Sequence, residues 1–119
     1  METKELYNVR VNLMQFYNNC NFSNLISEIN NYMSKTKDGS YIDKVNVDSN
    51  DHHITITIKE GTKEKYTNSI IREIKYLIKS FIETYNTYDK DLRSYINNKD
   101  SINTLCDVFK IGNNITFIL

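Results

Sequence analysis

The most regular hydrophobic pattern lies in the centre of the chain, over residues 66–85. Apolar side chains recur there every three or four residues, the spacing that places them on one face of an α-helix. Thr62 precedes this segment as a candidate cap, and Glu64 falls in the first turn, where the helix dipole favours an acidic side chain. The pattern predicts a helix of about 22 residues with an apolar face wide enough to pack on a sheet. The residues on this face are Tyr66, Ile70, Ile74, Leu77, Phe81 and Tyr85, joined by Ile71, Ile78 and Ile82.

A period of two indicates a β-hairpin before this helix. Residues 53–58 alternate strictly between polar and apolar side chains, and the apolar ones are β-branched. In residues 41–47, Tyr41, Val45 and Val47 share one parity, which indicates a second strand. The polar residues 48–51 between the two runs predict the connecting turn, so the hairpin buries one face.

The C-terminal end of the chain predicts a second hairpin. Apolar-rich runs at 106–111 and 115–119 flank a short loop that begins with Gly112. If the terminal run 115–119 is an edge of the sheet, it can pair with a second copy of the chain and build a homodimer. The order of the elements leaves open whether the two hairpins join in one sheet.

Weaker helical patterns flank these elements. Amphipathic periodicity over residues 6–20 and 25–33 predicts two N-terminal helices or one bent helix, and short helices are predicted near 87–96 and 101–105. The sum of these elements is an α+β fold in a single domain, residues 1–119. An antiparallel sheet of about four strands, made of two hairpins, packs against the long central helix and the N-terminal helices.

Composition is that of an ordinary globular protein, with 39% hydrophobic and 25% charged residues. The 15 basic residues equal the 15 acidic ones, so the chain lacks the overall positive field that draws proteins to nucleic acid or anionic membranes. No apolar run approaches the roughly 20 residues of a membrane-spanning helix, and the N-terminal residues lack a signal-peptide pattern. We therefore expect a cytoplasmic protein without a membrane partner.

The two cysteines fit that compartment. Cys20 and Cys106 lie far apart in apolar segments, which predicts two buried, reduced thiols. Frequent Lys, Asn, Ile and Tyr are typical of AT-rich genomes, such as those of low-GC bacteria, phages, other mobile elements and some viruses.

Candidate catalytic and metal-binding groups are few. His52 and His53 are the only histidines and lie beside Asp48 and Asp51. Adjacent residues of a strand point to opposite faces, so this pair is badly placed to hold one metal ion. The three glycines are isolated, which excludes the glycine-rich loops that bind nucleotide phosphates. The sequence predicts no catalytic residue, no metal site and no cofactor.

One group of charged residues falls on a single side of a predicted helix. On the predicted long helix, Lys65, Arg72, Lys75 and Lys79 follow one another at helical spacing and form a basic stripe on its outer side. The stripe can contact phosphates or a partner, or it is a solvated face partly balanced by Glu83. Tyr76 lies off the apolar face, where exposure next to these bases is expected.

Neutral charge, small size and missing catalytic motifs favour a non-catalytic protein-binding module of the inhibitor, immunity or adaptor type. Tyrosines beyond the needs of the core, such as Tyr85, Tyr88 and Tyr95, would supply area for a protein–protein interface.

Two other classes of function stay open. The alternative is a nucleic-acid-binding accessory protein that uses the basic stripe or a winged-helix-like C-terminal half. In that half, a recognition helix starting near Ser101 would offer Asn103 and Thr104 to base edges, and Lys110 would lie in the wing. A small enzyme that uses His53 with a carboxylate is the third hypothesis.

Overall fold

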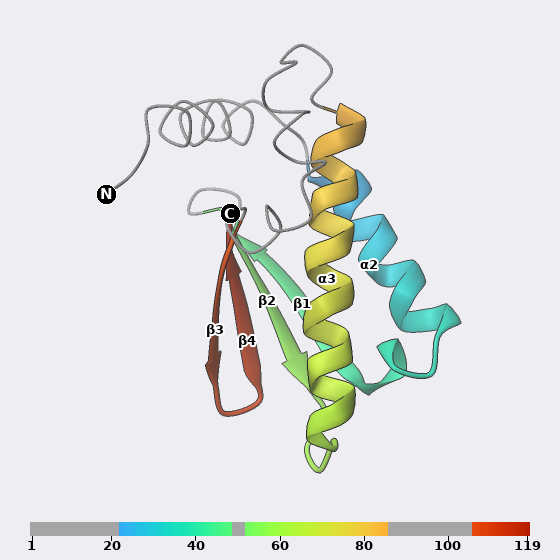
Figure 1. The fold of residues 1–119 in the computed structure, drawn as a ribbon. Coiled ribbons are helices and arrows are strands. Elements are labelled where there is room, and N and C mark those ends of the chain that lie inside the picture. The colour runs from blue at the N-terminus through green and yellow to red at the C-terminus, as the bar shows by residue number, and fades with distance from the viewer. Residues whose placement is uncertain (1–21, 49–51, 86–105) are drawn as a thin grey trace.

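A computed structural model of the chain describes residues 22–48, 52–85 and 106–119. This part of the chain forms two α-helices, one turn of 3₁₀ helix and four β-strands (Figure 1). The predicted helices at 6–20, 87–96 and 101–105 lie outside the described residues. The elements are α2 (Ser23–Lys35), η1 (Gly39–Tyr41), β1 (Ile42–Asp48), β2 (His53–Ile58), α3 (Glu64–Tyr85), β3 (Asp107–Ile111) and β4 (Asn114–Ile118).

The four strands form one antiparallel sheet in the order β1-β2-β4-β3. The two hairpins join because β2 pairs with β4, with Ile54 opposite Phe117 and Ile56 opposite Ile115. The predicted α+β class and the sheet of two hairpins are therefore confirmed.

The expectation that the terminal run 115–119 is an edge of the sheet is wrong, because β4 lies between β2 and β3. Ile115 and Phe117 of β4 are fully buried, whereas β3 leaves every side chain but that of Val108 exposed. Strand β3 contains two charged residues, Asp107 and Lys110, which stay in water at an edge, whereas β4 contains none.

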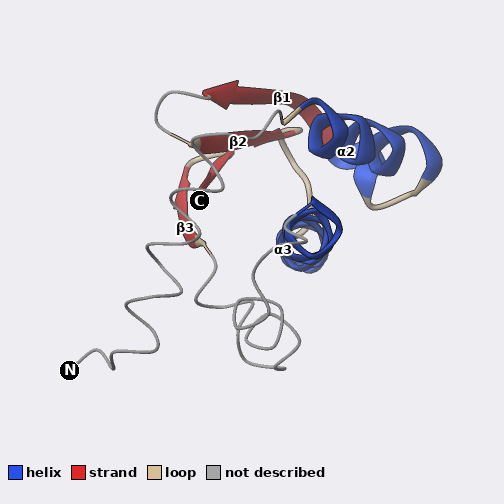
Figure 2. Ribbon diagram, turned by 90° about the horizontal axis from the view of Figure 1, so that it is seen from above, coloured by secondary structure: helices blue, strands red, loops and turns tan. Residues whose placement is uncertain are grey.

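The two helices form a layer beside the sheet. Seen from above, α3 lies against one face of the sheet and α2 packs next to α3 (Figure 2). The core lies between these elements. It contains Leu25 and Ile29 of α2, Ile54, Ile56 and Ile58 of β2, Ile70, Ile74, Ile78 and Ile82 of α3, and Ile115 and Phe117 of β4.

Helix α3 begins two residues before the apolar periodicity and extends to Tyr85. Its buried isoleucines recur every four residues, as the pattern predicts. The predicted cap by Thr62 is wrong, because the Thr62 hydroxyl donates to the carbonyl of Lys59 at 2.6 Å, in the turn before the helix. The carbonyl of Lys63 accepts the first helical hydrogen bonds instead.

Strand β1 contains an irregularity that its sequence pattern conceals. The pairing with β2 shifts between Ile42 and Lys44, so Asp43 is an extra residue without a direct partner. Such a bulge reverses the inside–outside alternation locally. Ile42 is buried for this reason, although its parity differs from that of Val45 and Val47, whose side chains also pack against the core.

Candidate functional site

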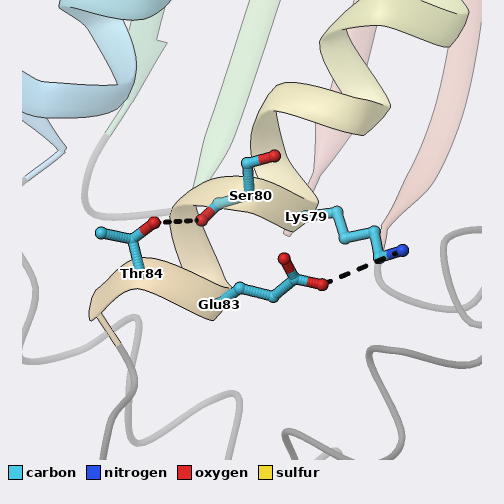
Figure 3. A network of polar contacts seen from close by, with 4 residues as sticks. All are labelled: Lys79, Ser80, Glu83 and Thr84. Atoms are coloured by element: carbon cyan, nitrogen blue, oxygen red, sulfur yellow. Dashed lines mark hydrogen bonds and ion pairs between the residues drawn. The ribbon is translucent and has the colours of Figure 1, made fainter.

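The structure separates the members of the basic stripe along α3. Lys65 is exposed in the first turn and Arg72 is exposed two turns later, whereas Lys75 and Lys79 are half-buried. Lys79 forms an ion pair with Glu83, with 3.9 Å between Nζ and Oε1 (Figure 3). Glu83 therefore partly neutralises the stripe near the C-terminal end of the helix, as expected from the sequence. The exposure of Tyr76, 57%, also agrees with its place off the apolar face.

At the end of α3 a groove of about 390 Å³ separates this helix from α2. Ser80 and Thr84 line it, and the Thr84 hydroxyl is already engaged because it donates to the Ser80 carbonyl at 2.8 Å (Figure 3). Glu28 supplies the carboxylate of the lining. Acid–base catalysis generally uses two ionisable groups that lie close together. Among the described residues that line the groove, Glu28 and Tyr76 are the ionisable ones.

The two histidines lie where the chain enters β2, and the alternation of this strand turns His53 away from the buried face. His52 occupies the turn with a φ of 56°, and His53 pairs with Asp48 of β1 and Ile118 of β4. Asp51 lies outside the described ranges. Within those ranges no three histidine, cysteine or acidic side chains gather closely enough to hold a metal ion.

Cys106 is a buried, free thiol just before β3, with 6% of its surface exposed. Burial raises the pKa of Cys106 to about 11, the charge of Lys75 opposes this rise, and the charge of Asp107 adds to it. A thiol that stays protonated near neutral pH is a poor nucleophile. The structure thus agrees with the expectation for Cys106, while Cys20 lies in the part of the chain that is not described.

We expect Cys106 to resist iodoacetamide in the folded protein at neutral pH and to react readily in urea, because the reagent needs an accessible thiolate. Labelling should accelerate as the pH approaches 11. Digestion followed by mass spectrometry separates Cys106 from Cys20 and measures each rate. Equal labelling rates for Cys106 in folded and unfolded protein would contradict its burial.

On the face of the sheet that is turned away from the helices, the side chains of β1 and β2 are mostly polar, whereas those of β3 are mostly apolar. Thr55 of β2 and Thr116 of β4 lie side by side, with 3.3 Å between their hydroxyl oxygens. On β3, however, Phe109 is 53% and Ile111 79% exposed. Large apolar side chains exposed together on the outermost strand of a sheet often mark an interaction surface. Sequence reasoning missed this surface because it assigned the edge to the terminal strand.

Comparisons with known proteins add no further assignment: no family model, no curated protein and no solved structure matches this chain. Neither described helix combines the length and the apolar character that crossing a membrane requires.

Proposed function

We propose that this chain is a non-catalytic protein-binding module that adds an extended segment of a partner protein to strand β3. The observation that carries the proposal is the exposure of Phe109 and Ile111 on β3, one of the two edge strands of the sheet. Exposed apolar side chains next to an open strand edge supply both contact area and main-chain hydrogen bonds to an added strand.

The main-chain geometry supports the same site. The two-residue loop after Ile111 makes Ile111 and Asn114 the closing pair of the hairpin. Alternate residues of an antiparallel strand direct their N–H and C=O groups to opposite sides. Along β4, the main-chain N–H and C=O groups of the odd-numbered residues face β2, because the Asn113 carbonyl accepts a hydrogen bond from the Ile58 amide at 2.8 Å. It follows that Val108 and Lys110 of β3 direct their main-chain groups away from β4.

Side chains on this edge define what the partner segment presents. Phe109 lies opposite Thr116, and Ile111 lies opposite Asn114, on the face turned away from the helices. A strand paired with β3 would place its own alternate side chains beside Phe109 and Ile111. The partner segment is therefore expected to carry apolar residues at every second position on that face, as in other cases of strand addition.

Binding can be tested with peptides in place of the natural partner. A random peptide library selected on the immobilised protein should yield peptides with apolar residues at alternate positions. A variant with Phe109→Thr and Ile111→Thr should bind these peptides about tenfold more weakly, because it loses two apolar contacts at the centre of the interface. Fluorescence anisotropy measures the affinities, and amide hydrogen exchange should slow at Val108 and Lys110 when a peptide is bound.

The opposite edge of the same sheet provides a matched control. Lys44→Thr combined with Asn46→Thr changes two exposed residues of β1 on the same face and should leave peptide binding unchanged. The proposal fails if the selected peptides bind the β3 variant as tightly as the unmodified protein, or if no peptide is enriched.

A further inference from the structure

Two lysines from separate segments meet at one tyrosine near the beginning of α3. Lys37 lies in the turn between α2 and η1, and Lys65 lies in the first turn of α3. The Nζ atoms of Lys37 and Lys65 are 5.6 and 4.9 Å from the centroid of the Tyr66 ring. We call Lys37, Lys65 and Tyr66 the Tyr66 cluster; it lies at the end of the molecule where α3 begins (Figure 1).

The backbone around the cluster holds its members in place. The Ser40 amide donates to the carbonyl of Lys37 at 3.1 Å, which closes the turn that carries this lysine. The Tyr66 amide donates to the carbonyl of Lys63 at 3.0 Å in the first turn of α3. The Tyr66 ring also stacks on Tyr41, with 4.6 Å between the centroids and an interplanar angle of 27°. The two lysine side chains therefore start from ordered main chain and converge on a supported ring.

The positive charge of the cluster is not neutralised locally. No carboxylate in the described segments forms an ion pair with Lys37 or Lys65. Asp38, the sequence neighbour of Lys37, accepts a hydrogen bond from the Ser69 hydroxyl at 2.7 Å. The charge of Lys37, followed by that of Lys65, holds the pKa of Tyr66 below its ordinary value. The same field would attract an anion from solution.

We propose that the Tyr66 cluster binds the dianionic phosphate group of a phosphate monoester. Two ammonium groups match the two negative charges of such a group, and the Tyr66 hydroxyl can donate to one of its oxygens. The site goes beyond the proposed function, because it lies on other elements than β3 and uses none of its residues.

The charge distribution favours a compact phosphate over a nucleic acid. A polynucleotide spreads its phosphates along a strand and requires a track of cations. Along α3 the next base after Lys65 is Arg72, two turns away, and Lys79 is paired with Glu83. The two lysines of the cluster instead both lie within 5.6 Å of the centroid of one ring, which suits a compact group with two charges.

The test is a titration of the full chain with inorganic phosphate, with phenyl phosphate and with a short oligonucleotide that lacks a terminal phosphate, followed by calorimetry and ³¹P NMR. Both phosphates should bind saturably. Lys37→Gln combined with Lys65→Gln should weaken binding about tenfold, because two charge-assisted hydrogen bonds are lost. Tighter binding of phenyl phosphate than of inorganic phosphate would assign the site to an organic monoester, and equal affinities would assign it to the phosphate group alone.

A second pair of exposed lysines in the turn before α3 supplies the control. Lys59→Gln combined with Lys63→Gln removes the same charge from the same end of the molecule and should leave the affinity nearly unchanged. If both double variants bound phosphate equally weakly, net charge alone would explain the loss of affinity, and the proposed site would be overturned. Tighter binding of the oligonucleotide than of either phosphate, or no saturable phosphate binding, would overturn it as well. Far-UV circular dichroism establishes that each variant is folded.

Discussion

Replacement of Ile74 with alanine should lower the free energy of unfolding by about 4 kcal/mol. Ile74 lies in the middle of α3, has no exposed surface and belongs to the core shared by α3, α2 and the sheet. Truncation removes three buried carbon atoms and leaves a cavity that the flanking isoleucines of a rigid helix cannot fill. Domains of this kind are stable by only about 5–15 kcal/mol, so the loss is a large part of the total. Urea denaturation followed by circular dichroism measures it.

Tyr76 provides the comparison on the same helix, because it is 57% exposed. Tyr76→Ala removes a larger side chain than Ile74→Ala does, yet it should change stability by less than about 1 kcal/mol. If the two variants lost the same stability, the assignment of the buried and exposed faces of α3 would be wrong.

Gly39→Ala should be the other strongly destabilising change, by about 3 kcal/mol. A Cβ atom on Gly39 would overlap the carbonyl oxygen of Tyr32 and would lie 2.6 Å from the carbonyl carbon and 2.7 Å from the Thr36 hydroxyl oxygen. That hydroxyl bridges the end of α2 to η1, since it donates to the Tyr32 carbonyl and accepts from the Gly39 amide. Main-chain atoms cannot move aside as a flexible side chain can, so the turn itself would have to open. Thermal and urea unfolding report the change.

A second glycine separates this steric effect from the general preference of turns for glycine. Gly61 has a φ of +82°, but beyond its two chain neighbours no heavy atom lies within 4 Å of the place that a Cβ atom would take there. Alanine at this position should cost only about 1 kcal/mol, through backbone strain alone. Similar losses for both glycines would show that close approach at Gly39 is not the cause.

Local patterns were sufficient to predict the main elements. The recurrence of apolar residues every three or four positions over residues 66–85 predicted α3, and the strict alternation of residues 53–58 predicted β2. Each pattern depends on neighbours within one element. The irregular pairing after Ile42 was not predicted, since a bulge depends on the partner strand.

The candidate sites were predicted only in part. Lys65 was among the expected phosphate contacts, but Lys37 was not, because a turn after α2 brings it to Tyr66 from outside the helix. The exposure of Phe109 and Ile111 was also missed. A strand with apolar residues has the same sequence pattern at an edge as in the interior, so its environment cannot be inferred from the strand alone.

The amino-acid sequence by itself determined the class of the fold, the two hairpins and the apolar face of the long helix, because periodicity and turn residues act over short distances. Tertiary structure alone decided that β2 pairs with β4, that β3 is an edge strand and that Lys37 and Lys65 lie over the same tyrosine ring. Each of these facts depends on which surfaces far apart in the chain exclude water together, and such pairings are selected by the packing of the whole core.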